Sequence, residues 1–152
     1  MAIRRLDPNE VFKFVSMSDE AIDTEKSDMK AFRQDRDYKK LTIKEGMQPT
    51  FFLVKNIGAR KEKEVKEGHF AWEPQGVDEK TGQPLPAKLK INDETGLTIK
   101  YFEAAVQEVE EFKDGQWVKS KTTVDEWPSH IVSEVGAFIM TRTSMAASVK
   151  KS

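Results

Sequence analysis

Apolar runs in the first half of the chain predict two strands and one short helix. Val11 to Val15 alternates around Lys13 and is rich in β-branched and aromatic residues, which is typical of a strand with one buried face. Thr50 to Ile57 is the most apolar run, so we expect a strand that is buried on both faces if it lies centrally in a sheet. Ala59 to Glu67 is rich in helix formers with Lys/Glu pairs at three- and four-residue spacing, which predicts a short exposed helix.

Two similar turn signals divide the middle of the chain. Asp78 to Gly82 and Asn92 to Gly96 both end in Thr-Gly, which is typical of a turn that places glycine at positive φ between antiparallel strands. Alternation around the second turn predicts a hairpin between Lys88 to Ile91 and Leu97 to Tyr101. Phe102 to Phe112 is ambiguous between helix and strand, because its apolar residues fall at helical spacing next to hairpin signals; we favour a helix.

The last part of the chain predicts a tight hairpin and then the strongest helix. Asp114-Gly115 is a two-residue hairpin signal, and Pro128 suits a first helical position. An apolar line along the helix consists of Ile131, Val135, Phe138 and Met145, widened by Val132 and Ile139. Gly136 lies inside this helix at a cost of about 1 kcal/mol relative to alanine, so we expect another element to approach its backbone closely.

The segment from Asp19 to Lys40 breaks the apolar pattern. Of its 22 residues, 13 are charged, and its few apolar residues form no sustained stripe. Such a composition buries too little surface to offset the entropy of ordering, so residues 19–40 are expected to form a polar loop or arm that can include a short helical turn. Together the elements predict a single α+β domain over residues 1–152: an antiparallel sheet of hairpins, a packed C-terminal helix and a charged N-terminal arm or loop.

Composition and charge narrow the class of function. The 152 residues are 38% hydrophobic and 34% charged, which is polar for a globular domain. The net charge of −1 gives no long-range attraction to nucleic acid or to an anionic membrane. The absence of cysteine excludes disulfides, thiolate nucleophiles and cysteine-ligated metals. We expect a soluble protein, because no secretion signal is visible and no segment approaches the roughly 18 to 20 apolar residues of a membrane span.

No set of side chains predicts a reaction. His69 and His130 have no partner at metal-ligand spacing, which favours ordinary surface or helix-end histidines. Carboxylate pairs carry little information in a chain with 26 acids, and the Ile57 to Lys61 junction lacks the spacing of a phosphate loop. We therefore expect no enzyme, no cofactor, no metal and no small-molecule substrate. A small hydrolase is the least favoured alternative.

Three tryptophans, Trp72, Trp117 and Trp127, are the candidate interaction residues. Tryptophans near turns and helix starts can stack on bases or sugars, but they are more often core anchors or interface hot spots, and we favour the last two roles. Basic residues from Arg60 to Lys66 alternate with glutamates that cancel a basic patch, so a nucleic-acid-binding accessory protein is an alternative of lower rank.

The order of these features resembles small proteins encoded in the structural gene clusters of tailed bacteriophages. The resemblance rests on Pro49-Thr50 before a strand, on a charged helix after it, and on the Phe112-Lys113-Asp114-Gly115 turn. It also rests on a helix that Pro128 opens and that contains Glu134-Val135 and Ile139. The chain departs from the family pattern at Val109, where the family usually has tryptophan, and in His69 to Gly96, which has no counterpart.

The resemblance implies non-enzymatic work in virion assembly, as a structural component of head or tail. A tail-assembly chaperone that leaves the particle is the alternative. The implied partners are other phage structural proteins in a homo- or hetero-oligomeric assembly, and the implied location is the virion, after synthesis in the cytoplasm of the bacterial host. No catalytic residue is implied.

Overall fold

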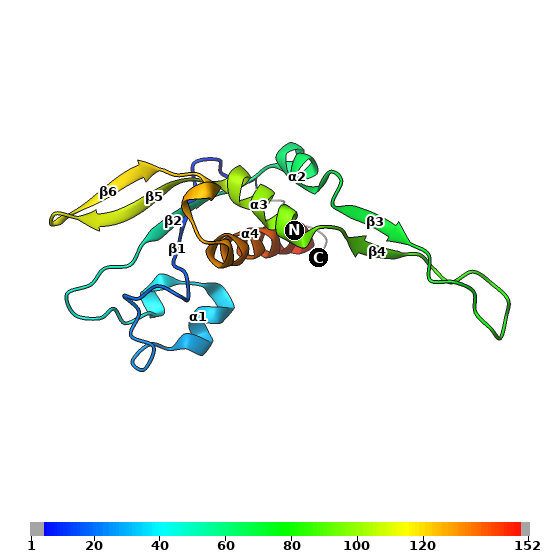
Figure 1. Ribbon diagram of the computed structural model, residues 1–152, viewed down its shortest axis with the longest axis horizontal. Helices are drawn as coiled ribbons and strands as arrows, with labels where there is room; N and C mark the ends of the chain where they lie inside the picture. The colour runs from blue at the N-terminus through cyan, green and yellow to red at the C-terminus, as the bar shows by residue number, and fades with distance from the viewer. Residues whose placement is uncertain (1–4, 150–152) are drawn as a thin grey trace.

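The computed structural model describes residues 5–149, and side chains up to residue 143. Within that range the chain forms six strands, four α-helices and two short 3-10 helices, which confirms the predicted α+β class (Figure 1). In chain order these are β1 (Val11–Phe14), α1 (Met29–Asp35), η1 (Tyr38–Lys40), β2 (Phe51–Lys55), α2 (Ala59–Lys66), β3 (Phe70–Glu73), β4 (Lys88–Ile91), α3 (Glu94–Ala105), β5 (Val106–Lys113), β6 (Gln116–Lys121), η2 (Val124–Glu126) and α4 (Ser129–Val149).

A four-stranded antiparallel sheet organises the fold, with strand order β1-β2-β5-β6. The strand β2 lies inside the sheet, and residues 51–54 are all buried, as the continuous apolar run predicted. The register pairs Phe14 with Phe52, and Phe52 with Val109. Residues directly opposite each other in a sheet share a face, so these three side chains build one side of the core.

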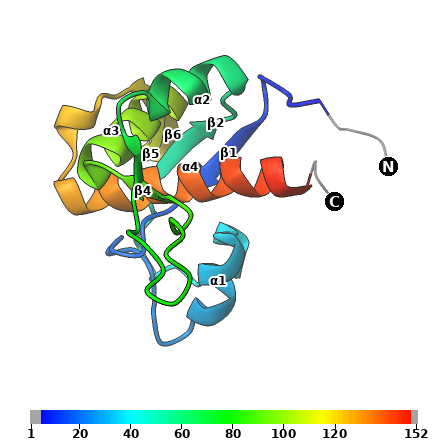
Figure 2. The same cartoon turned by 90° about the vertical axis from the view of Figure 1, so that its right-hand side faces the viewer.

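Three helices cover that face of the sheet. Buried residues of α2, α3 and α4 join the sheet residues in one apolar cluster. The largest fully buried side chains of the helices are Leu97, Tyr101, Phe102 and Ile139. Figure 2 shows α3 and α4 running beside each other along the sheet. Their contact explains the glycine in α4: a Cβ on Gly136 would lie 2.4 Å from the carbonyl oxygen of Thr98. The predicted close backbone approach is therefore confirmed.

The C-terminal helix is present as predicted, but its most buried line differs slightly. Val132, Val135 and Ile139 are buried, whereas Ile131 and Phe138 are only partly buried at the side of the cluster. The side chain of Met145 lies outside the described residues. No helix within residues 5–149 is long and apolar enough to cross a membrane.

The segment predicted as a polar loop or arm is a loop that contains the short helices α1 and η1, and it packs against the opposite face of the sheet. Ile22 and Phe32 are almost fully buried in a second cluster with Val15, Phe51 and Leu53. The expectation that residues 19–40 bury too little surface to pack is wrong. Two well-placed apolar side chains anchor the segment, and the isolated bridge between Ile22 and Ile43 closes it into a loop.

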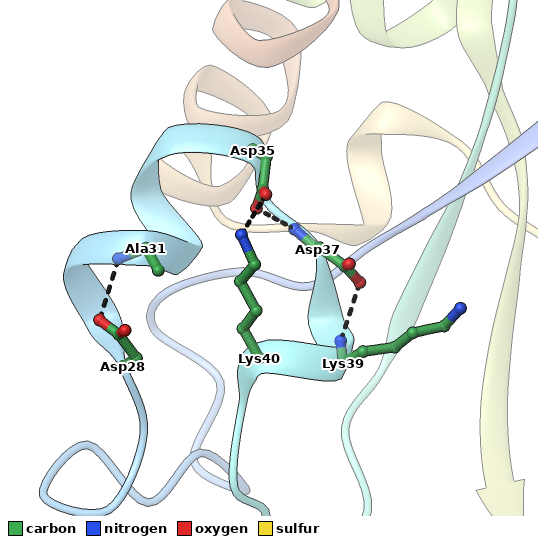
Figure 3. Close-up of polar contacts among 6 residues, drawn as sticks. All are labelled: Asp28, Ala31, Asp35, Asp37, Lys39 and Lys40. Carbon is green, nitrogen blue, oxygen red and sulfur yellow. Dashed lines mark hydrogen bonds and ion pairs between the residues drawn. The ribbon is translucent and has the colours of Figure 1, made fainter.

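Short-range polar contacts also stabilise this loop (Figure 3). The Asp28 carboxylate accepts a hydrogen bond from the Ala31 backbone N–H at 3.1 Å and caps α1. Asp37 caps η1 in the same way through the Lys39 N–H at 3.0 Å. Asp35 pairs with Lys40. Several of the aspartates that made the segment resemble a disordered arm therefore accept hydrogen bonds from its own backbone N–H groups.

The second Thr-Gly turn starts a helix, so the hairpin predicted between 88–91 and 97–101 is wrong. Asp93 adopts a left-handed φ of 54°, and its carboxylate accepts a hydrogen bond from the Gly96 N–H at 3.0 Å, which caps α3. Leu97, Tyr101 and Ala105 then follow at four-residue spacing, and all are buried. The strand β4 pairs with β3 instead.

The ambiguous segment 102–112 divides between two elements. Its first residues complete α3, and from Val106 onward the chain forms β5, so the helix that we favoured is wrong for residues 106–112. The helical spacing of Val106, Val109 and Phe112 is coincidental. These residues form a strand because they pair with β2 and β6.

Candidate functional site

Two β-hairpins project from the body of the molecule in opposite directions (Figure 1). One is formed by β5 and β6, and the other is formed by β3 and β4 together with the loop that joins them, residues 70–91, which we call the arm. Each is built by a local turn signal. Both carry large apolar side chains that the fold leaves exposed.

The β5–β6 hairpin ends in the predicted two-residue turn. Asp114 and Gly115 have φ values of 51° and 79°, the left-handed pair that matches the twist of a tight hairpin. Next to the turn, Phe112 and Trp117 lie opposite each other with ring centroids 5.4 Å apart. They are 43% and 41% exposed, so the tip presents a small aromatic surface.

The free edge of β6 is protected against strand pairing. All six residues of β6 are exposed. Lys119 and Lys121 stand opposite Glu110 and Glu108 in the register. Lysines on an edge strand discourage another chain from extending the sheet, so contacts at this hairpin are expected from its side chains at the tip and not from its backbone.

The arm is an amphipathic ribbon. Its register pairs Phe70 with Ile91 and Trp72 with Leu89, which places these four apolar side chains on one face. At the base, Phe70 and Ile91 pack against the main core. Farther out, Trp72 is 71% exposed and Leu89 is 49% exposed, so the apolar face continues beyond the body of the molecule without a cover.

The ribbon continues past its two strands to the first Thr-Gly turn. Backbone hydrogen bonds join Leu85 N–H to Gly76 and Asp78 N–H to Gln83, each at 2.9 Å. Gly82 has a φ of 70°, which confirms the predicted glycine at positive φ. Val77 and Leu85 are also exposed. A two-stranded ribbon is at best marginally stable in water, so an arm of this kind is suited to ordering against a partner.

A groove lies between α1 and α4 beside β1. Its volume is about 560 Å³, and its apolar lining comes from Phe12, Ala137 and Phe138. Arg33 and Arg142 line it as well. No sequence pattern pointed to this groove, because its lining comes from segments about 100 residues apart in the chain.

A partly buried ion pair lies in one wall of the groove. Arg36 ends α1 with a φ of 57°, and its Nη2 lies 2.8 Å from Glu134 Oε2. Glu134 also accepts hydrogen bonds from Ser16 Oγ at 2.6 Å and from the Met17 N–H at 2.9 Å. The Arg36 guanidinium stacks 4.9 Å from the Phe14 ring. This network ties the end of α1 and the segment after β1 to α4.

The three tryptophans do not form one site. Trp72 lies on the arm and Trp117 at the tip of the other hairpin, where both are exposed. Trp127 is a core anchor: its ring centroid is 4.7 Å from that of Phe52, and its Nε1 donates to Thr122 Oγ1 at 2.7 Å. The sequence favoured either a core anchor or an interface hot spot for each tryptophan, and Trp127 is a core anchor.

The titratable side chains that the structure describes, up to residue 143, form no recognisable reaction centre. His69 is buried after α2, with Nδ1 3.2 Å from the Asn92 carbonyl oxygen, so the surface position that we considered for it is wrong. His130 is exposed in the first turn of α4. Burial raises the pKa of Tyr101 to about 12. Among residues 5–149, no group of three or more histidine or acidic side chains is placed to hold a metal ion.

Comparison with known proteins identifies no relative: no family model matches the sequence, and no curated protein or solved structure matches it.

Proposed function

We propose that this protein is a non-enzymatic assembly protein, a structural component of a tailed-phage particle that works through protein–protein contacts. The observation that carries the proposal is the uncovered apolar face of the arm. Single exposed apolar residues are ordinary on protein surfaces. An aligned set on a projecting ribbon is different, because its side chains form one continuous exposed apolar surface. A two-stranded ribbon is also only marginally stable on its own, so the isolated chain gains little stability by ordering it.

The second hairpin supports the same role. Its aromatic tip points away from the arm (Figure 1), so the molecule offers contact surfaces at two opposite ends. A protein with surfaces at both ends can link two neighbours. Such an arrangement suits a component of a repeating assembly better than it suits a binder of one small ligand.

The phage setting rests on the resemblance of the sequence motifs. In the fold these motifs occupy structural positions: Pro49 and Thr50 lead into β2, residues 112–115 contain the turn of the β5–β6 hairpin, and Pro128 precedes α4. These motifs therefore lie in segments that lead into β2 and α4 or that form the tip of the β5–β6 hairpin.

The experiment that tests the proposal removes the outer arm. Residues 72–89 are replaced by Asn-Gly, a two-residue turn that joins Ala71 to Lys90, which lie opposite each other in the register, and that removes the exposed apolar face with Trp72 and Leu89. Because the core lies outside this segment, the thermal midpoint of the shortened protein should stay within a few degrees of that of the wild type. Assembly of infectious particles, measured by complementation, should be lost, whereas Lys80→Ala at the arm turn should assemble normally.

Mass spectrometry of purified particles then distinguishes the possible roles. A structural component is retained in the particle, and an assembly chaperone is required but absent from it. Normal particle yield with the shortened arm would contradict both roles. Tight, strongly salt-dependent DNA binding in fluorescence anisotropy would move the proposal to a nucleic-acid-binding accessory protein.

A further inference from the structure

We infer that a pocket between the β5–β6 hairpin and the loop after η1 binds a neutral sugar ring of a glycan, which packs against Trp117 and Tyr38. This pocket is separate from the groove between α1 and α4. Three observations lead to the inference: a row of aromatic rings, an ion pair beside them, and a pocket lining without net charge. Sugar binding goes beyond the proposed assembly function and does not depend on it.

Four aromatic rings form a continuous row on the face of the sheet opposite to α4. The ring centroid of Phe51 lies 5.0 Å from that of Tyr38 and 5.3 Å from that of Trp117. Phe112 continues the row beyond Trp117, with the two centroids 5.4 Å apart. Phe51 is buried, whereas Tyr38 is half-buried and Trp117 is 41% exposed. Phe51 is therefore the floor of the row, and the rings on either side of it are open to a ligand.

A pocket of about 350 Å³ lies among these rings. Its apolar lining consists of Tyr38, Phe51 and Trp117 together with residues 41, 43 and 49. The volume is at the lower end of the range of roughly 300–1,000 Å³ for small-molecule sites, which suits a single ring. One face of a sugar ring presents C–H groups, and such an apolar face packs well on a large aromatic side chain.

An ion pair supplies polar groups to the same pocket. Lys13 Nζ lies 3.1 Å from Glu110 Oε1 and 5.2 Å from the centroid of the Phe51 ring. The Glu110 side chain is only 10% exposed, and its Oε2 has no hydrogen-bond partner among the described residues. A pair with one partner this deeply placed adds little net stability, because the cost of desolvation offsets the attraction. Its position beside the aromatic rings therefore favours a role in binding.

The chemistry of this pair matches hydroxyl groups better than it matches an ion. A hydroxyl both donates and accepts, so neighbouring sugar hydroxyls can donate to Glu110 and accept from Lys13. The carboxylate of Glu110 would repel an anion. The ammonium of Lys13 already occupies the position over the Phe51 ring that an external cation would take. A purely apolar ligand would cover the pair without giving it any hydrogen bond.

Single-stranded nucleic acid is the less suitable occupant. Bases do stack on aromatic rows of this kind, but the backbone phosphates also need a basic surface along the strand. On β6, Lys119 and Lys121 stand opposite Glu110 and Glu108 in the register. Acids therefore alternate with bases beside the pocket, which favours an uncharged ligand over a polyanion.

Titration with defined sugars tests the inference. Isotope-labelled protein is titrated with three neutral trisaccharides, maltotriose, cellotriose and triacetylchitotriose, and binding is followed by NMR and by tryptophan fluorescence. At least one of the three should bind, with the chemical-shift changes concentrated in residues 38–51 and 108–121. The affinity should not change with salt concentration, because a neutral ligand releases no counterions.

Two substitutions assign the binding to this pocket. Trp117→Ala should weaken binding about tenfold or more, since it removes the most exposed aromatic wall. Trp72→Ala is the matched control, because this tryptophan is exposed on the arm, away from the pocket. Glu110→Gln should weaken binding severalfold, because a charged acceptor is lost. Glu111→Gln, at the next position of β5 and on the other face of the sheet, should bind as the wild type does.

The NMR spectrum of each variant shows whether it is folded before its affinity is compared. The inference would be overturned if none of the three trisaccharides bound, or if Trp117→Ala bound them as tightly as Trp72→Ala. It would also be overturned if a single-stranded oligothymidylate or a sulfated trisaccharide bound more tightly than every neutral one, because the pocket would then select an anion.

Discussion

Replacing Gly136 with alanine tests the packing of α3 on α4, which holds the main core together. The added Cβ would lie 2.4 Å from the Thr98 carbonyl oxygen and 2.8 Å from its carbonyl carbon, below the 3.0 Å that real Cβ contacts respect. The two helices would have to separate by at least 0.6 Å, the difference between those limits. Because the obstacle is backbone, no rotamer change can relieve it.

Two opposing contributions set the sign of the effect. Alanine favours the helix by about 1 kcal/mol relative to glycine. Overpacking against an unyielding neighbour costs about 1–3 kcal/mol, and a backbone obstacle places the cost at the upper end. We expect a net destabilisation of about 1–2 kcal/mol, or a fall in the thermal midpoint of about 2–8 °C for a chain of this length.

Thermal and urea unfolding of Gly136→Ala measure this effect. Gly58→Ala is the matched control, because nothing lies within 4 Å of the methyl group that it adds. Its stability should change by less than about 1 kcal/mol, as expected for a helix N-cap. If Gly136→Ala were as stable as the wild type or more stable, helix propensity would dominate, and the close contact between α3 and α4 would be refuted.

Three further predictions follow from single polar groups. Tyr101→Phe should leave stability at neutral pH unchanged or raise it by up to about 1 kcal/mol, because the buried hydroxyl has no partner among the described residues. Since the folded pKa of Tyr101 is raised to about 12, wild-type stability should decline as the pH rises from about 10 towards that value, and urea titrations should find a smaller decline in the variant. Glu134→Gln should cost about 2 kcal/mol, because it removes the charge from the hydrogen bonds to Arg36 and the Met17 N–H, and it should accelerate hydrogen exchange in residues 17–43 first; uniform acceleration would contradict its anchoring role. The hydrogen bond from Lys40 lowers the pKa of Asp35, so the small stabilisation by this pair is present above the ordinary pKa of the carboxyl and lost as the pH falls through the lowered one. NMR titration should find a smaller shift in Lys40→Ala, where the hydrogen bond from the Asp37 N–H remains.

The parts of the fold that the sequence predicted correctly depend on local patterns. The run from Thr50 to Ile57 contains the buried strand β2, Asp114-Gly115 is the hairpin turn, and the helix after Pro128 is present. The close approach at Gly136 was also predictable, because glycine in a strong helix needs a packing reason. In each case the prediction depends only on residues that are neighbours in the sequence.

The parts that the sequence did not predict depend on distant partners or on capping. Ile22 and Phe32 order a charged loop only because the sheet offers them a second apolar face, which composition cannot reveal. Asp93 turns a hairpin signal into a helix start through a single side-chain hydrogen bond. Trp72 could be named as a candidate from its residue type and its local sequence. The groove could not be predicted, because its lining combines residues of β1, α1 and α4.

Hydrogen exchange measures whether the arm is the contact surface of the protein. The backbone amides of residues 70–91 are compared between the isolated protein and the assembled state, with β2 as the internal reference. We expect rapid exchange in the outer arm of the isolated protein, where a two-stranded ribbon is only marginally stable, and strong protection after assembly. Equal exchange of the outer arm in both states would contradict the claim that this ribbon is the contact surface of the protein.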